Sequence, residues 1–294
     1  MSFKQQLAEV QQQTESGLQR ALAFIDCPDP ELADAMAYSL FNGGKRVRPF
    51  LVQAAAKAVG AAEQSTAVAM AAVEMVHSYS LVHDDLPAMD DDDLRRGQPT
   101  CHIKFNEATA ILAGDALLTN AFEVLADMPA PLTAGQRLQL IRLLSKGAGA
   151  AGMVAGQAID LASVGKQVDL EHLERMHGYK TGALIRISVL MGAHCGEPDE
   201  STLTALAEYA DAIGLAFQVQ DDILDVEGDT ATLGKQQGAD EALNKPTYPA
   251  LLGLDGAKQK AQLLHQQALS ALQKVSGDTS DLAALADYII ARDH

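Results

Sequence analysis

The chain has 294 residues, 48% of them hydrophobic and 4% aromatic, and its formal net charge of −17 argues against a general nucleic-acid binder, which would carry a basic face. The three cysteines, Cys27, Cys101 and Cys195, match neither a disulfide framework nor a zinc site, so we expect reduced thiols in a cytoplasmic protein. We expect neither a signal sequence nor a membrane span, because no apolar run approaches the required length.

The first half of the chain is predicted to form helices separated by short turns. Apolar residues recur at helical spacing up to about Ile25, and the prolines that follow end this first helix. A turn rich in glycine and basic residues is predicted at 42–49, and an alanine-rich helix follows it. A long apolar helix is predicted over 66–86, where Pro87 stops it.

The second half continues the same pattern. Residues 127–131 and 163–166 are predicted as connecting loops. A proline and acidic residues in a first turn predict a helix start at 197–201, and this helix should run to about Val226. Long stretches without proline, and little alternation of apolar and polar residues, predict an all-α protein. No repeat or linker divides the chain, so we expect a single domain over 1–294.

Two aspartate clusters, each followed by basic residues, are the most informative pattern. The second cluster contains Asp221, Asp222 and Asp225, and Lys235 follows it. Asp221 and Asp225 share one helix face, and Gln218 lies on the same stripe. A solvated acidic surface is the alternative, but the apolar neighbours predict a half-buried segment, where unneutralised carboxylates are costly. Hard oxygen ligands beside basic residues indicate Mg²⁺ and a phosphate or diphosphate.

The first cluster contains Asp84, Asp85 and Asp90, and Arg95 and Arg96 follow it. On an ideal helix, Asp84 and Asp90 would lie about 240° out of phase. A local bulge at the intervening proline would bring Asp90 beside Asp84. The three aspartates directly after Asp90 have two interpretations of equal weight. They are either metal ligands or solvated residues that pair with the arginines.

A basic segment and a histidine complete the set. The segment 43–49 offers flexible backbone amides and three cations beside a helix start, which suits a diphosphate, although such a turn alone is usually structural. His77 precedes Asp84 by nearly two helical turns and shares its face. Lys180 and Thr181 lie in a helical stretch, where a lone lysine would mean little.

Taken together, these motifs resemble those of the trans-isoprenyl diphosphate synthases, in particular the bacterial members that form farnesyl diphosphate. Matching features run in order from Gly43 to Lys235 and cover essentially the whole chain. The two additional residues in the first aspartate motif are similar to the bacterial and plant-plastid form. The resemblance implies an all-α bundle of long helices around a central cavity. It also implies a Mg²⁺-dependent, head-to-tail condensation of isopentenyl diphosphate with dimethylallyl and geranyl diphosphates, through an allylic carbocation, to farnesyl diphosphate.

The resemblance implies a role for each motif residue. Three Mg²⁺ ions would be held by Asp84, Asp85, Asp90, Asp221, Asp222 and Asp225. The two diphosphate substrates would be bound by Gly44, Lys45, Arg48, His77, Arg95, Arg96, Lys180, Thr181, Gln218 and Lys235. The carbocation would be stabilised by dipoles of Lys180, Thr181 and Gln218, as preorganised electrostatics requires.

The resemblance also bears on product length and assembly. Tyr79 lies five residues before Asp84, about 7.5 Å deeper along the same helix. We expect its ring to form the floor for the growing chain, because its neighbour Ser80 is too small to do so; an ordinary core tyrosine is the alternative. A homodimer is expected from the resemblance, and also because the helix over 66–86 is too apolar for a surface position.

Three other functions compete with this interpretation. A terpene cyclase would share the fold and the first motif, but its second motif usually contains Asn or Asp, Ser or Thr, and Glu, whereas residues 221–225 contain only aspartates as polar residues. A metal-dependent phosphohydrolase of the His-Asp class would use His83 and Asp84 but would leave the second cluster and the segment 43–48 without a role. A non-catalytic acidic helical protein predicts no Mg²⁺-dependent turnover.

Overall fold

The computed structural model describes residues 2–227 and 246–292. Within these ranges the regular structure is helical apart from one two-stranded hairpin, so the predicted all-α class is confirmed. The helices are α1 (Phe3–Phe24), α2 (Pro30–Phe41), α3 (Val47–Ala58), α4 (Ala67–Asp84), α5 (Cys101–Lys104), α6 (Glu107–Asp127), α7 (Ala134–Ala148), α8 (Met153–Ser163), α9 (Leu170–His177), α10 (Ala183–His194), α11 (Glu200–Glu227), α14 (Tyr248–Leu272) and α15 (Ser280–Ala291). The hairpin consists of β1 (Leu94–Arg95) and β2 (Gln98–Pro99), and a π-helical turn, Gly178–Gly182, joins α9 to α10.

Local sequence signals set the ends of the helices. Asp29 caps α2 by accepting a hydrogen bond from the Leu32 amide, and Pro30 occupies the first helical position. Thr133 and Gln136 form a capping box at the start of α7. The predicted break between the first two helices and the predicted long helix α11 are both present.

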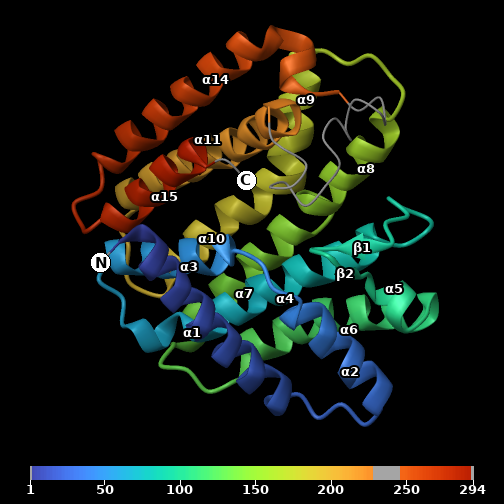
Figure 1. Cartoon of the computed structure of the whole chain (residues 1–294). Coiled ribbons are helices and arrows are strands. Elements are labelled where there is room, and N and C mark those ends of the chain that lie inside the picture. Colours follow the sequence, from blue (N-terminus) through green and yellow to red (C-terminus); the bar gives the residue numbers. More distant parts are fainter. Residues whose placement is uncertain (1, 228–245, 293–294) are drawn as a thin grey trace.

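Helix α4 runs through the middle of the bundle and is buried on almost every side. Figure 1 shows α1 and α2 along one flank of the molecule and α11, α14 and α15 along the opposite flank, with α4 and α10 between them. Twelve of the 18 residues of α4 are buried, among them Val68, Val73 and Val76, which are fully inaccessible. Burying each such side chain contributes roughly 1.5–3 kcal/mol. We expected a second copy of the chain to cover this apolar helix; that reason for a dimer is wrong, because the chain's own helices cover it.

Helix α6 is the one described helix that is long and apolar enough to be a membrane-span candidate, a feature that the sequence prediction missed. Seven of its residues, including Ala113, Leu117 and Val124, are buried against the bundle. On its other side Ile111 and Leu112 are 43% and 56% exposed. The core helix of a soluble protein can have the same length and apolar composition, so these two properties are weak support for a membrane span.

Both aspartate clusters lie at helix C-termini. The first is at the end of α4 and in the turn after it, and the second is in the last two turns of α11. The C-terminal end of a helix carries partial negative charge, which disfavours carboxylates there. The fold therefore concentrates negative charge at two points and increases the demand for cations.

Candidate active site

A cavity of about 350 Å³ lies beside the C-terminal half of α4. Its walls come from α4, α8, the π-helical turn and the start of α10. Arg48, Asp84 and Lys180 are among its polar lining residues, whereas Met153 and Leu184 belong to its apolar wall. This volume is typical of small-molecule sites, so the predicted central cavity is present.

A second pocket, of about 580 Å³, adjoins the first. Arg48 and His77 line both. The rest of the second pocket is formed mainly by residues 42–47, most of which belong to the basic segment 43–49, and by Arg96 and Arg292. Five cationic side chains and one acidic side chain line it, so it is suited to a polyanion. The molecule thus has an apolar cavity with a carboxylate in its wall next to a strongly basic pocket.

The turn after α4 brings Asp90 back to Asp84. Helix α4 ends at Asp84, and the amide of Asp90 donates to the Asp84 carbonyl at 2.8 Å. Burial raises the pKa of Asp84 to about 6; the negative charge of Asp90 adds to this shift, and Lys180 opposes it. The predicted bulge is therefore confirmed, and it brings Asp90 close enough for its negative charge to disfavour the ionised form of Asp84.

Within each cluster, one aspartate is buried and bound by the protein. Asp85 is 3% exposed and accepts a hydrogen bond from Arg95 Nε at 3.0 Å. Asp222 is 6% exposed and accepts one from the amide of Tyr248 at 2.8 Å, at the start of α14. Asp221 is also bound by the protein, through an ion pair with Arg292, but it is only half-buried. Each cluster thus combines one fully buried carboxylate with others that remain partly accessible.

The accessible carboxylates fit a hard divalent cation. No three Asp, Glu, His or Cys side chains in the described ranges converge into a preassembled cation site. However, Asp84, Asp90 and Asp225 offer only oxygen donors, and none of the three is fully buried. The raised pKa of Asp84, caused mainly by its burial, shows that its ionised form is disfavoured without a bound cation. Mg²⁺ binds through a few carboxylates together with substrate phosphate oxygens, so an incomplete protein shell is the arrangement that it requires.

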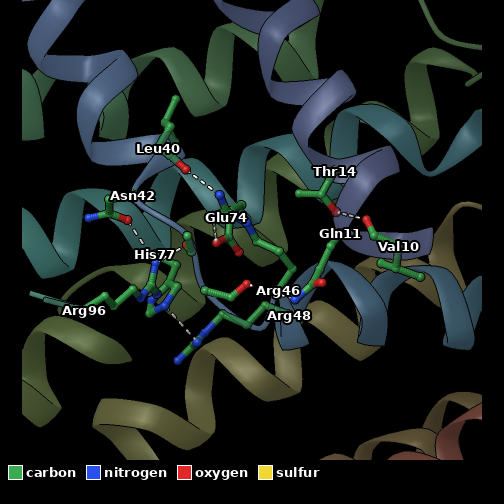
Figure 2. A network of polar contacts seen from close by, with 12 residues as sticks. Val10, Gln11, Thr14, Leu40, Asn42, Arg46, Arg48, Glu74, His77 and Arg96 are labelled. Carbon is green, nitrogen blue, oxygen red and sulfur yellow. Dashed lines mark hydrogen bonds and ion pairs between the residues drawn. The ribbon is translucent and has the colours of Figure 1, made fainter. Parts of the chain in front are cut away.

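The basic segment is held in a tight conformation above α4. Arg48 Nη1 lies 3.2 Å from His77 Nε2. Burial and the charge of Arg48 keep the pKa of His77 well below its ordinary value, so the ring is neutral and accepts this hydrogen bond. Arg96 donates to Asn42 Oδ1 at 3.0 Å (Figure 2). A Cβ on Gly44 would lie 2.6 Å from the Arg96 guanidinium. Gly44 is required there because its φ is +118° and Arg96 packs against it.

Lys180 and Thr181 lie in the π-helical turn, and both line the apolar cavity. A π-helical turn interrupts the regular backbone hydrogen bonds and is frequent at functional sites. Gly156 of α8 makes room for it, because a Cβ there would lie 2.1 Å from the Lys180 amide nitrogen. Lys180 Nζ contacts Asp160 at 2.5 Å.

The profile of the polyprenyl synthetase family matches residues 29–287. The chain belongs to the polyprenyl synthetase family. It is 53% identical to the farnesyl diphosphate synthase of Haemophilus influenzae, over 99% of this chain and 98% of that one. It is also 53% identical to the farnesyl diphosphate synthase of Escherichia coli, over 99% of both chains.

Solved structures agree with this assignment. An FPP/GFPP synthase from Zymomonas mobilis superposes with a TM-score of 0.88 at 37% identity, over 98% of this chain and 99% of that one. Geranylgeranyl pyrophosphate synthetase from Pyrococcus horikoshii superposes with a TM-score of 0.89 at 29% identity, over 99% of each. The resemblance read from the motifs is confirmed, and the His-Asp phosphohydrolase and non-catalytic interpretations lose their support.

Ten of the predicted site residues of this polyprenyl synthetase family member line one or both pockets: Gly44, Lys45, Arg48, His77, Tyr79, Ser80, Asp84, Arg96, Lys180 and Thr181. Asp85, Asp90, Gln218 and the second aspartate cluster line neither pocket. Lys235 lies outside the described residues, and Arg95 is turned toward Asp85 and Asp92. Three residues were not predicted as part of the site: Asp160, which pairs with Lys180; His177, whose Nδ1 is 3.2 Å from Gln218 Nε2; and Arg292, which pairs with Asp221. Each is distant in sequence from its partner, so no local spacing could have identified it.

Proposed function

We propose that this chain is a Mg²⁺-dependent prenyltransferase that condenses isopentenyl diphosphate with dimethylallyl and then geranyl diphosphate, head to tail, to give (2E,6E)-farnesyl diphosphate. The observation that carries this proposal is the adjoining pair of pockets, one apolar with carboxylates at its edge and one strongly basic. Two substrates with diphosphate heads, one of them with a growing hydrocarbon tail, need this combination. The relatives that are 53% identical are named farnesyl diphosphate synthases, which supports the same product.

In this proposal the basic pocket binds the diphosphate of isopentenyl diphosphate. Lys45, Arg48 and Arg96 supply positive charge, Gly44 allows close approach of the backbone, and neutral His77 orients Arg48. The allylic substrate lies in the neighbouring cavity with its tail along the apolar wall. Arg48 borders both pockets and therefore stands between the two reacting heads.

The carboxylates of the two clusters would hold up to three Mg²⁺ ions, with Asp84, Asp90, Asp221 and Asp225 as direct ligands. Asp85 and Asp222, which are anchored by Arg95 and the Tyr248 amide, would act mainly by fixing the ends of their helices. When bound, Mg²⁺ neutralises the diphosphate and makes it a better leaving group. Lys180, Arg95 and Lys235 would complete the positive charge around the allylic diphosphate.

The remaining steps are assigned to the chain's own groups. Departure of the diphosphate leaves an allylic carbocation, and the backbone carbonyl of Lys180, the Thr181 hydroxyl and the Gln218 amide direct dipoles toward it. The apolar wall excludes water, which would otherwise convert the cation to an alcohol. The double bond of isopentenyl diphosphate attacks, and loss of a proton to the released diphosphate restores an alkene.

A single assay tests the proposal. The purified protein is incubated with geranyl and isopentenyl diphosphates and MgCl₂, and the products are identified by mass spectrometry after dephosphorylation. We expect farnesol as the main product and no turnover when EDTA replaces MgCl₂. Turnover of geranyl diphosphate alone to a cyclic hydrocarbon would instead indicate a terpene cyclase, and release of inorganic phosphate alone a phosphohydrolase.

A cytoplasmic homodimer is part of the same proposal. The three cysteines of the chain are free thiols, which suits a reducing compartment. The exposed pair Ile111 and Leu112 on α6 is an apolar surface that a second copy could cover. We expect light scattering at micromolar concentration to give twice the 31.1 kDa of one chain. The double variant Ile111→Asp/Leu112→Asp should shift the protein toward monomer. A wild-type mass near that of one chain would contradict the proposal.

A further inference from the structure

Arg46 lies between Lys45 and Arg48 in the basic segment, and its guanidinium is engaged by other groups of the protein. Its side chain is 1% exposed. Nη1 donates to Glu74 Oε1 at 2.5 Å, and Nη2 donates to the Leu40 carbonyl at 2.5 Å (Figure 2). Both terminal nitrogens are thus engaged with protein groups. The segment therefore contains two kinds of cation, and Arg46 is the one directed inward.

The contacts of Arg46 join two helices at the point where the segment crosses them. The Leu40 carbonyl belongs to the last turn of α2, whose carbonyls lack partners within the helix. Glu74 belongs to α4 and is 2% exposed, and its second oxygen, Oε2, is buried with no hydrogen-bond partner among the described residues. Arg46 is the cation that is hydrogen-bonded to Glu74, whereas Arg48 and Arg96 act on it only as nearby charges. A buried carboxylate without such a bonded partner is strongly unfavourable.

The segment has little regular structure of its own to hold it in place. Gly43, Gly44 and Arg46 all have positive φ, and 52° at Arg46 is an uncommon value for a residue with a side chain. Helix α3 begins only at Val47, without a side-chain cap. A backbone of this kind persists only where tertiary contacts hold it, and the Arg46–Glu74 pair is the fully buried contact here.

The same face of α4 orients both arginines. Glu74 and His77 are three residues apart on α4, so they lie on adjacent turns of one face. Glu74 binds Arg46, and His77 accepts from Arg48 at 3.2 Å. One rigid helix thus holds both arginines. With Arg46 and Arg48 fixed in this way, Lys45 and Arg48 lie in the wall of the basic pocket.

We propose that Arg46 and Glu74 are positioning residues that set the geometry of the diphosphate-binding segment for isopentenyl diphosphate, without contacting that substrate. This inference rests on the proposed function. It predicts a selective effect, because the pair belongs to the inner wall of the basic pocket, where its charges are paired with each other and almost inaccessible, and it does not line the apolar cavity. Loss of the pair should weaken binding of isopentenyl diphosphate and leave the allylic substrate nearly unaffected.

Paired substitutions separate this role from a contribution to stability. Arg46→Met or Glu74→Met alone leaves a buried charge and should lower Tm. The double variant Arg46→Met/Glu74→Met removes both charges while keeping similar volume, which is often neutral for stability. We expect the double variant to regain a Tm near that of the wild type, yet to have a KM for isopentenyl diphosphate raised about tenfold or more, with the KM for geranyl diphosphate within about twofold. Glu74→Gln, which keeps an acceptor, should give an intermediate KM.

The matched control is Lys274→Met/Glu208→Met, which removes an exposed ion pair that lines neither pocket and should change neither KM. Calorimetric titration with isopentenyl diphosphate measures the same loss without turnover. A double variant with normal affinity for isopentenyl diphosphate, or with equal losses for both substrates, would overturn the positioning role. A wild type that forms no prenyl product would instead contradict the proposed function, together with this inference.

Discussion

Asp84→Asn and Asp221→Asn are each expected to lower kcat by about three orders of magnitude or more while the protein stays folded. Asp84 lines the apolar cavity, and Asp221 lies near the C-terminal end of α11, beside Arg292. Each substitution removes one anionic oxygen donor from a cluster that is not preassembled, so the remaining donors cannot compensate. Steady-state rates with geranyl and isopentenyl diphosphates across a MgCl₂ titration test this. Asp255→Asn, at an exposed position on α14, serves as the control.

The same change at Asp84 should stabilise the metal-free protein. The pKa of Asp84 is about 6 in the folded protein against an ordinary 3.8, so the folded state binds this proton more tightly than the unfolded state. Stability therefore falls as pH rises from 3.8 to about 6, and the full cost is present above that range. Asp84→Asn should raise Tm at pH 7.5 in EDTA by on the order of a few degrees, with the gain vanishing in acid. Near-normal kcat at saturating MgCl₂, or a lower Tm at pH 7.5, would refute the assignment of Asp84.

Tyr79→Ala is expected to change the main product from fifteen carbons to twenty or more. Tyr79 is 7% exposed, lines the apolar cavity and packs edge-on against His83, with ring centroids 5.6 Å apart. The neighbouring Ser80 hydroxyl donates to the His77 carbonyl at 2.8 Å, and this small side chain cannot replace the ring as a barrier. Removing the ring extends the space along α4 in the direction in which the tail would grow.

Product analysis by chromatography, at equal conversion, measures the change in chain length. Tyr79→Phe is the matched control: it keeps the ring, loses only the hydroxyl and should still stop at fifteen carbons. Loss of a large buried side chain can destabilise the fold by roughly 3–5 kcal/mol, so Tm is recorded for each variant. A folded, active Tyr79→Ala enzyme that still releases only farnesyl diphosphate would show that another residue forms the floor.

Local signals in the sequence determined the secondary structure and much of the chemistry. Proline positions and apolar periodicity predicted α1, α4 and α11 with ends close to those observed. The break at Pro87 predicted the turn that returns Asp90 to Asp84. These features depend on neighbours within one or two turns, so they can be read without knowing the tertiary structure. The family assignment followed from motifs of the same local kind.

Only the tertiary structure decided which members of each motif face a pocket and which are structural. In the sequence, Arg46 and Arg48 look equivalent, as do Asp84 and Asp85; in the fold, Arg46 pairs with Glu74 and Asp85 with Arg95. The sequence also suggested that a partner chain covers α4, whereas α4 is covered by the chain itself. Periodicity indicates that a face is buried but does not identify what buries it. Contacts such as Arg292 with Asp221, 71 residues apart, arise from the packing of helices, and no spacing along the chain encodes them.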